Sequence, residues 1–234
     1  MPEIKAVLWD VDGTLLDFLA AEREAIKTCF SLFGLGECTD EMIAQYSAIN
    51  VRWWQALERG EHTKPEILVG RFAEFFTARG IDTAVAPAFN AEYQLRLGDT
   101  IVFCPHAKET VLALRGRAAQ CAVTNGTKVA QDKKLDRSGL DKLLDPIFIS
   151  EVVGAEKPSR EFFAPVFAAF PGIKPEEMLI VGDSLTSDIR GGINAGIRTC
   201  WYNPNGHAAP PELSIDYTIS DIAEVLQIVE KSAQ

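Results

Sequence analysis

Short apolar segments alternate with longer amphipathic ones over most of the chain. Residues 4–9 are rich in apolar side chains and end at Asp10, which is typical of a strand buried on both faces of a parallel sheet. Helical patterns separate the later segments of this kind, and strands that alternate with helices indicate βαβ units. The predicted strands cover 4–9, 118–123, 146–149, 178–181, 197–202 and 216–219. The pattern therefore predicts an α/β fold built on a parallel sheet.

Amphipathic segments with ordinary start and stop residues supply the helices between these strands. Pro105 stands at the start of one of them, and Gly139 ends another. The predicted helices cover 105–115, 128–138, 159–170, 186–195 and 221–231. Residues 151–158 are predicted to form a loop, in which Pro158 keeps Lys157 out of a helix.

The stretch between the first and second strands carries helical patterns and no strand. Gly80 and Gly98 end two of its helices, and Thr39 is a typical N-cap for another. The predicted helices cover 20–33, 40–60, 64–79 and 83–97. A stretch of about eighty residues is large enough for a small domain. The expected organisation is an α/β core of residues 1–17 plus 100–234, with an all-helical cap of residues 18–99 inserted after the first strand.

The composition excludes several classes of protein. The formal net charge of −10 argues against a nucleic-acid polymer as partner, because such a partner requires a basic face. The five cysteines form no CxxC motif, so neither a zinc site nor a disulfide framework is expected, and reduced thiols fit a cytoplasmic protein. No apolar run reaches the roughly 18 residues that cross a bilayer, and the first residues do not resemble a signal peptide. We therefore expect no membrane partner.

Two aspartates follow the first strand directly. Asp10 and Asp12 are two residues apart, so in an extended chain both side chains point to the same side. Two neighbouring carboxylates repel each other unless a cation lies between them or one carries a proton. Gly13 permits a turn and a close approach of the backbone to a ligand. This arrangement indicates a chemical site at the end of the strand.

Polar residues also follow two later strands. Thr124 and Asn125 come after the second strand, and Asp183 comes after the fourth. The carboxyl ends of parallel strands meet at one edge of the sheet, where open α/β sheets bind ligands. Carboxylates without histidine or thiolate ligands suit Mg²⁺, and turn amides with one lysine, Lys157, suit a phosphate. The set is typical of phosphoryl transfer.

These motifs, in this order, resemble the haloacid dehalogenase (HAD) superfamily. They are Asp-Val-Asp-Gly-Thr at 10–14, Thr-Asn at 124–125, Lys-Pro at 157–158, and Gly-Asp-Ser-Leu-Thr-Ser-Asp at 182–188. The resemblance covers essentially the whole chain. It implies a Rossmann-like, doubly wound parallel sheet with an inserted helical cap of the C1 type. It also implies a Mg²⁺-dependent phosphomonoesterase that acts through an aspartyl-phosphate.

The resemblance assigns roles to individual residues. Asp10 would be the nucleophile, and Asp12 would protonate the leaving oxygen and later activate water. Lys157 would steady Asp10 and the transferred group, and Thr124 would assist catalysis by holding phosphoryl oxygens. The implied phosphate-binding residues are Gly13, Thr124, Asn125 and Lys157. The implied metal-site residues are Asp10, Asp12 through its backbone carbonyl, Asp183, and Asp188 through water or through Lys157.

A second resemblance concerns the cap and the C-terminal part. Residues 50–64, 71–72, 182–196 and 201–204 are similar to the bacterial pyrimidine 5′-nucleotidase group of this superfamily. This implies a small phosphorylated substrate, with nucleoside monophosphates favoured. Aromatic side chains can stack on a base and an amide can bond to its edge, so Trp53, Trp54 and Asn50 are the candidate specificity residues.

Other functions share parts of this pattern. A small sugar-phosphate or phosphoglycolate phosphatase, or a phosphomutase, would use the same catalytic residues. The dehalogenase branch of the superfamily carries a different residue in place of Asp12, and a phosphonatase would need a cap lysine that forms a Schiff base. A non-catalytic binding module is the alternative outside enzymes, although no motif is damaged. The sequence makes no prediction of the oligomeric state.

Overall fold

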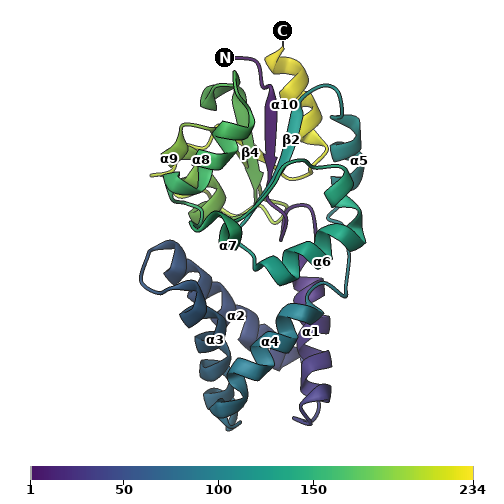
Figure 1. The fold of residues 1–234 in the computed structure, drawn as a ribbon, viewed down its shortest axis with the longest axis vertical. Coiled ribbons are helices and arrows are strands. Elements are labelled where there is room, and N and C mark those ends of the chain that lie inside the picture. The colour runs from purple at the N-terminus through teal and green to yellow at the C-terminus, as the bar shows by residue number, and fades with distance from the viewer. Residues whose placement is uncertain (1, 234) are drawn as a thin grey trace. The chain divides into compact units, whose positions relative to one another are not determined.

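A computed structural model describes residues 2–233 (Figure 1). The chain divides into two compact units. One contains the residues up to Phe18 and those from Ile101 onward, and the other contains Leu19–Thr100. The first unit is α/β and the second is helical.

The α/β unit is organised around a six-stranded sheet in which all neighbouring strands are parallel. Both β1 and β4 are buried along their whole length, as their apolar sequences predict. The predicted α/β fold with a parallel sheet is confirmed. In spatial order the strands are β3 (Ile147–Ile149), β2 (Ala119–Thr124), β1 (Ala6–Trp9), β4 (Met178–Gly182), β5 (Arg198–Tyr202) and β6 (Tyr217–Ile219).

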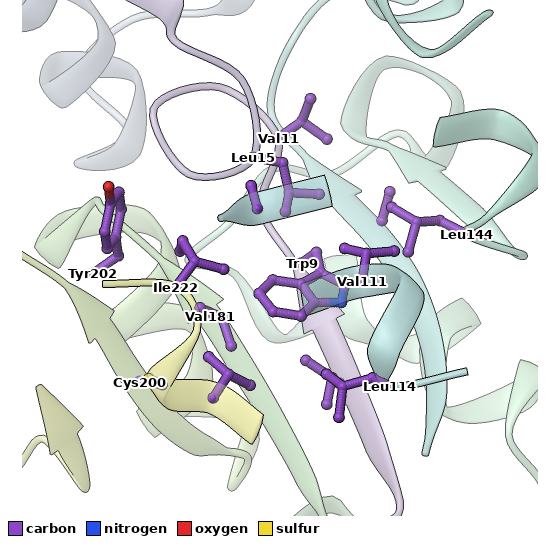
Figure 2. Packing of buried hydrophobic residues seen from close by; sticks show 14 of the residues in the cluster. Trp9, Val11, Leu15, Val111, Leu114, Leu144, Val181, Cys200, Tyr202 and Ile222 are labelled. Atoms are coloured by element: carbon purple, nitrogen blue, oxygen red, sulfur yellow. The ribbon is translucent and has the colours of Figure 1, made fainter. Parts of the chain in front are cut away.

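Successive side chains of β1 belong to two different apolar clusters, as the two-residue repeat of a strand requires. Val7 and Trp9 pack with side chains of α5 (Ala107–Ala113), α6 (Lys128–Ser138) and α10 (Glu224–Ser232). Figure 2 shows Trp9 among Val111, Leu114 and Val181 in this cluster.

Ala6 and Leu8 pack with the opposite set of helices, α8 (Arg160–Ala169) and α9 (Arg190–Ala195). Figure 1 shows α8 and α9 on one side of the sheet and α5 and α10 on the other. Helices therefore cover both faces, and the predicted doubly wound sheet is confirmed.

The register of the central strands brings their carboxyl ends together. Trp9 pairs with Ala122 of β2 and with Val181 of β4. The backbone N–H of Asp10 continues this ladder and donates to the carbonyl of Val181 at 2.9 Å. The segments that follow β1, β2 and β4 consequently start at one edge of the sheet.

The helical unit is built from α1 (Phe18–Leu32), α2 (Asp40–Glu58), α3 (Lys64–Arg79) and α4 (Ala86–Arg96). The hydroxyl of Thr39 caps α2 by accepting from the N–H of Met42, and Gly80 ends α3 with φ of 66°. Its interior is aromatic, with edge-to-face and stacked ring pairs. The rings are those of Phe30, Tyr46, Phe72, Phe75, Phe76, Phe89 and Tyr93.

Local differences from the predicted elements have local causes. The prediction of a loop over 151–158 is wrong at its start, because Ser150–Val153 forms the one-turn helix α7, which is too short to show a period. His106 has φ of 59°, so α5 begins after it and is shorter than predicted. A π-helical turn, Leu185–Ile189, precedes α9. The remaining short turns are the 3₁₀ segments Thr83–Val85, Leu140–Lys142 and Pro175–Glu177.

Within residues 2–233, none of the helices combines the length and the apolar character that crossing a membrane requires.

Candidate active site

Lys157 is the centre of the polar cluster at the end of β1. Its ammonium Nζ donates to Asp10 Oδ1 at 2.8 Å, to Asp188 Oδ1 at 2.6 Å and to the carbonyl of Val123 at 2.7 Å. The side chain is 1% exposed. A lysine has three donors, and all three are used. Lys157 is therefore a fixed, buried positive charge between two carboxylates.

Burial and the charge of Lys157 shift the pKa of Asp10 in opposite directions, and burial and the neighbouring carboxylates do the same for Lys157. Burial raises the pKa of Asp10 to about 7, with the Asp188 carboxylate adding to the rise and Lys157 opposing it. For Lys157, burial lowers the pKa, but the negative charges of Asp10 and Asp188 outweigh it and leave the pKa above its ordinary value. Lys157 thus stays charged, while Asp10 needs further positive charge to stay ionised at neutral pH.

Asp183 completes a group of three carboxylates. Oxygens of Asp10, Asp183 and Asp188 lie within 4.8 Å of one another. The Asp183 side chain keeps an accessible surface, yet protein surrounds most of it. This partial removal from water, together with the charges of Asp10 and Asp188, raises the pKa of Asp183 well above its usual range. Three hard oxygen ligands and one lysine leave an excess of negative charge, which fits a divalent cation such as Mg²⁺.

Gly13 and Thr14 complete the turn around these carboxylates. Gly13 has φ of 89°, and a Cβ built on it would lie 2.5 Å from Asp183 Oδ2. Only glycine fits both the backbone angle and the space. The buried hydroxyl of Thr14 donates to Asp10 Oδ2 at 3.2 Å. The turn after β1 therefore orients Asp10 and leaves room for Asp183.

Asn125 connects the end of β2 to the loop that carries the lysine. Its amide Nδ2 donates to the carbonyl of Lys157 at 2.8 Å, and its Oδ1 accepts from the N–H of Lys157 at 2.9 Å. The buried hydroxyl of Thr124 accepts from the N–H of Gly126 at 3.1 Å. Both amide ends of Asn125 are thus used to hold the backbone of Lys157.

The carboxylate of Asp12 has partners that the sequence interpretation missed. Lys134 Nζ donates to its Oδ1 at 2.5 Å, and Gln131 Nε2 donates to its Oδ2 at 2.6 Å. Both partners come from α6 and both are 1% exposed. Within residues 2–233 the carboxylate of Asp12 is not part of the three-carboxylate group. A detectable signal existed, because Gln131 and Lys134 share a helix face that Ala130 and Leu135 mark as buried.

A tryptophan of β5 supports the loop that carries Asp183. Trp201 is 4% exposed, and its indole N–H donates to the backbone carbonyl of Asp183 at 2.9 Å. Groups that orient a ligand residue commonly tune metal affinity. Trp201 therefore contributes to the position of Asp183 without reaching the cluster itself.

Replacing Trp201 by phenylalanine removes this hydrogen bond and keeps most of the apolar contact. The loss of one such bond is worth about 0.5–1.5 kcal/mol. We expect a weaker Mg²⁺ affinity by about 3–10-fold, and a metal-free protein that is less stable to unfolding by about the same 0.5–1.5 kcal/mol. Titration calorimetry with Mg²⁺ checks this, and an unchanged dissociation constant would show that the bond does not position Asp183.

Magnesium should stabilise the protein in a pH-dependent way. The pKa values of Asp10 and Asp183 are raised in the folded, metal-free protein. Their contribution to stability is therefore fully present below the unfolded value near 3.8 and is lost as the pH rises through the folded values. Mg²⁺ binds the ionised forms, so we expect it to add about 2–3 kcal/mol near pH 8 at about 100 times its dissociation constant, and much less near pH 5.

Differential scanning fluorimetry at the two pH values measures this effect. Asp183→Asn is the control, since it should remove most of the Mg²⁺-induced shift at the higher pH. An equal shift at both pH values, or none in the wild-type protein, would contradict the assignment of a cation site.

The candidate specificity residues Asn50, Trp53 and Trp54 all lie on α2 of the helical unit. Asn50 is 2% exposed, with its Nδ2 donating to Glu22 Oε2 at 2.9 Å and its Oδ1 accepting from Arg71 Nη1 at 2.6 Å. The Asn50 amide therefore belongs to a buried polar network inside the helical unit.

The two tryptophans differ in how they are held. Trp53 donates its indole N–H to Glu74 at 2.8 Å, its ring contacts the tilted ring of His62, and it lies against Gly70. The half-buried ring of Trp54 lies beneath the guanidinium of Arg71, 5.9 Å from its centroid. Trp53 is thus engaged in packing on three sides.

Comparisons with known proteins identify the family and the relatives of this chain. The model of the haloacid dehalogenase-like hydrolase family matches residues 4–196. The HAD-hydrolase YfnB of Bacillus subtilis is 36% identical over 229 residues, which are 98% of this chain and 97% of YfnB. A crystal structure of YfnB bound to magnesium has a TM-score of 0.91 and covers 97% of this chain and 99% of that one.

Two relatives carry a specific activity in their names. The pyrimidine 5′-nucleotidase PynA of Streptococcus pneumoniae is 32% identical over 97% of this chain and 96% of its own length. The pyrimidine 5′-nucleotidase YjjG of Escherichia coli is 30% identical over 96% of this chain and 97% of its own length.

Proposed function

The chain belongs to the haloacid dehalogenase-like hydrolase family and is a phosphoric monoester hydrolase, and we propose that it hydrolyses pyrimidine nucleoside 5′-monophosphates with Mg²⁺ through a phosphoryl-Asp10 intermediate. The observation that carries the catalytic part is the buried ammonium of Lys157, which joins Asp10 and Asp188 at the end of β1. The two pyrimidine nucleotidase relatives support the substrate class.

The donor set is compatible with magnesium. Asp10, Asp183 and Asp188 supply only oxygen ligands. Among the described residues, the positive charge that pairs with this group is that of Lys157. In this proposal Asp10 and Asp183 would hold Mg²⁺ together with the backbone carbonyl of Asp12, and Asp188 would act through Lys157. Bound Mg²⁺ would neutralise charge on the carboxylates and on the phosphoryl oxygens of the substrate.

The residues of the chain would then perform two displacements. In the first, an oxygen of the Asp10 carboxylate forms a bond to phosphorus and the bond from phosphorus to the ester oxygen breaks. The ester oxygen keeps the electron pair of that bond and takes a proton from Asp12. In the second, the oxygen of a water molecule forms a bond to phosphorus while Asp12 receives a proton from the water. The bond from phosphorus to the Asp10 oxygen breaks, its electron pair restores the Asp10 carboxylate, and inorganic phosphate leaves.

Fixed positive charge and backbone amides would hold the transferred group. Lys157 lies against Asp10 in a buried position, where a charge acts more strongly than in water. Asn125 fixes the backbone of Lys157, and the N–H groups of the turns after β1 and β2 are suited to phosphoryl oxygens. Thr124 and Gly13 belong to those turns, which supports the phosphate-binding roles proposed for them.

Selection of the substrate is proposed to reside in the helical unit, residues 18–99. Of the three candidate residues, Asn50 and Trp53 hydrogen-bond to side chains of other helices, whereas the half-buried ring of Trp54 lies next to the cation of Arg71. Aromatic rings and guanidinium groups are suited to stacking on a base. Asn50 would contact a base only by exchanging its bonds to Glu22 and Arg71.

A substrate panel tests the proposal. Phosphate release would be measured for dUMP, UMP, dTMP and several sugar phosphates, each with Mg²⁺ and with excess chelator. We expect the pyrimidine nucleotides to be the best substrates and the chelator to abolish release. Equal or faster turnover of sugar phosphates would favour the alternative of a sugar-phosphate phosphatase. No release from any ester with Mg²⁺ would contradict the enzymatic assignment.

A further inference from the structure

The Asp12 carboxylate is held by two side chains of one helix. Lys134 donates to one of its oxygens at 2.5 Å and Gln131 donates to the other at 2.6 Å. The Asp12 side chain is 22% exposed, whereas that of Lys134 is 2% exposed. We call Gln131 and Lys134 the α6 clamp. It approaches the carboxylate from one side and occupies both of its oxygens.

Neighbouring residues leave room for the side chains of the clamp and pack against them. Gln131 and Lys134 are three residues apart and therefore share a face of α6. A Cβ on Gly126 would collide with the side chain of Gln131, so this glycine leaves the space that the amide occupies. Lys134 Nζ also lies over the ring of Phe18, 5.1 Å from its centroid. Burying a lysine is costly unless it is paired, and the partner of Lys134 is Asp12.

We infer that Gln131 and Lys134 are positioning residues that set the orientation of Asp12 for proton transfer to the leaving oxygen. This inference rests on the proposed function, in which Asp12 donates that proton. When the bond between phosphorus and the ester oxygen breaks, the electron pair stays on the ester oxygen and the proton of Asp12 moves to it. A carboxyl group can deliver the proton only from within hydrogen-bond reach of that oxygen. The clamp restricts the carboxyl group to one orientation.

The leaving group separates this role from a purely structural one. A nucleoside 5′-oxygen leaves as a strongly basic alkoxide unless it is protonated, whereas p-nitrophenolate leaves without a proton. General acid catalysis contributes about 10²–10⁴-fold where it is needed. Loss of the clamp should therefore slow nucleotide hydrolysis far more than hydrolysis of p-nitrophenyl phosphate. Damage to the fold would slow both reactions alike.

The experiment compares Lys134→Met, Lys134→Arg and wild type on a nucleoside monophosphate and on p-nitrophenyl phosphate, with saturating Mg²⁺. For Lys134→Met we expect kcat/KM, which reports the first displacement and not the later water step that Asp12 also serves, to fall about 10²-fold on the nucleotide and less than about 10-fold on the aryl ester. Lys134→Arg keeps the charge and a donor, and should recover most of the nucleotide turnover. Arg137→Met, an exposed site on the same helix, should behave like wild type on both substrates.

Each outcome decides a specific point. Equal losses of kcat/KM on both substrates, or no rescue by arginine, would overturn the inference and leave Lys134 as a packing residue. If Lys134→Met does not fold, Gln131→Met removes the other half of the clamp without a change of charge. This variant should still shift the ratio of the two rates in the same direction. An unshifted ratio overturns the inference. Absence of turnover in the wild-type protein would instead contradict the proposed function.

Discussion

Replacing Asp10 by asparagine is expected to lower the rate of phosphate release by about 10⁴-fold or more, because an amide cannot form the phosphoryl intermediate. The fold should remain intact. Lys157 keeps its bonds to Asp188 and to the carbonyl of Val123. Burial raises the pKa of Asp10 to about 7, which means that the ionised carboxylate is less favourable in the folded protein than in the unfolded chain. A neutral amide removes this cost, so metal-free Asp10→Asn should be at least as stable as wild type near pH 8.

Activity and thermal unfolding measured on the same samples check both parts of this expectation. Asp132→Asn is the matched control, because Asp132 is an exposed aspartate of α6 that pairs with Lys128, and it should retain wild-type turnover. Turnover by Asp10→Asn within about tenfold of wild type would exclude Asp10 as the nucleophile.

Replacing Arg71 by methionine is expected to destabilise the helical unit by about 3–5 kcal/mol. Arg71 is 1% exposed, and it donates to Asn50, which in turn donates to Glu22. Burial raises the pKa of Glu22, while Ser47, Arg71 and Asn50 oppose the rise. Without the guanidinium charge, Glu22 would be a buried carboxylate with no cation in the network.

The pH dependence of this destabilisation has a definite sign. A raised folded-state pKa for Glu22 means that protonation favours the folded state, and removing Arg71 raises that pKa further. The destabilisation should therefore be smaller near pH 5 than near pH 8, and Glu22→Gln in the same chain should recover part of it. Denaturant unfolding measures these differences. Arg52→Met is the control, since Arg52 forms an exposed pair with Glu74 worth at most about 1 kcal/mol. If Arg71→Met destabilises the protein no more than Arg52→Met does, the role of the network is refuted.

The fold was predictable because its signals are local and repeated. The apolar run of β1 and the alternation of strands with helices determine the sheet, and Thr39 and Gly80 mark helix ends by their own capping chemistry. The one-turn helix α7 escaped prediction because four residues are too few to display a period. The left-handed backbone of His106 escaped because it is rare outside glycine.

The sheet topology predicted the candidate-site residues that follow strand ends, and the resemblance of the motifs added Lys157 and Asp188. Asp10, Asn125 and Asp183 come directly after β1, β2 and β4, so the parallel topology alone brings their positions to one edge. The α6 clamp follows no strand end, and its only local signal was the helix face that it shares with Ala130 and Leu135. A lysine and a glutamine on a helix are usually solvent-exposed, and only the packing of α6 buries them against Asp12.

The polar network of the helical unit also depends on how helices pack together, which the sequence does not show locally. Glu22, Asn50 and Arg71 are far apart in the sequence and meet only when α1, α2 and α3 pack together. The amide of Asn50, chosen from the sequence as a group that would contact a base, is instead bonded at both ends inside the unit. Its role toward the substrate stays a prediction.

The central claim is that Asp10 becomes phosphorylated during turnover, and peptide mass spectrometry after acid quench tests it most directly. Asp12→Ala with p-nitrophenyl phosphate should be used beside wild type, because this leaving group needs no proton from Asp12 while the proposed activation of water does, so the variant should accumulate the intermediate. The account predicts one added phosphoryl group on the peptide that contains Asp10, which hydroxylamine removes and which is absent without Mg²⁺. Turnover without any adduct on Asp10, or an adduct on a different residue, would contradict it.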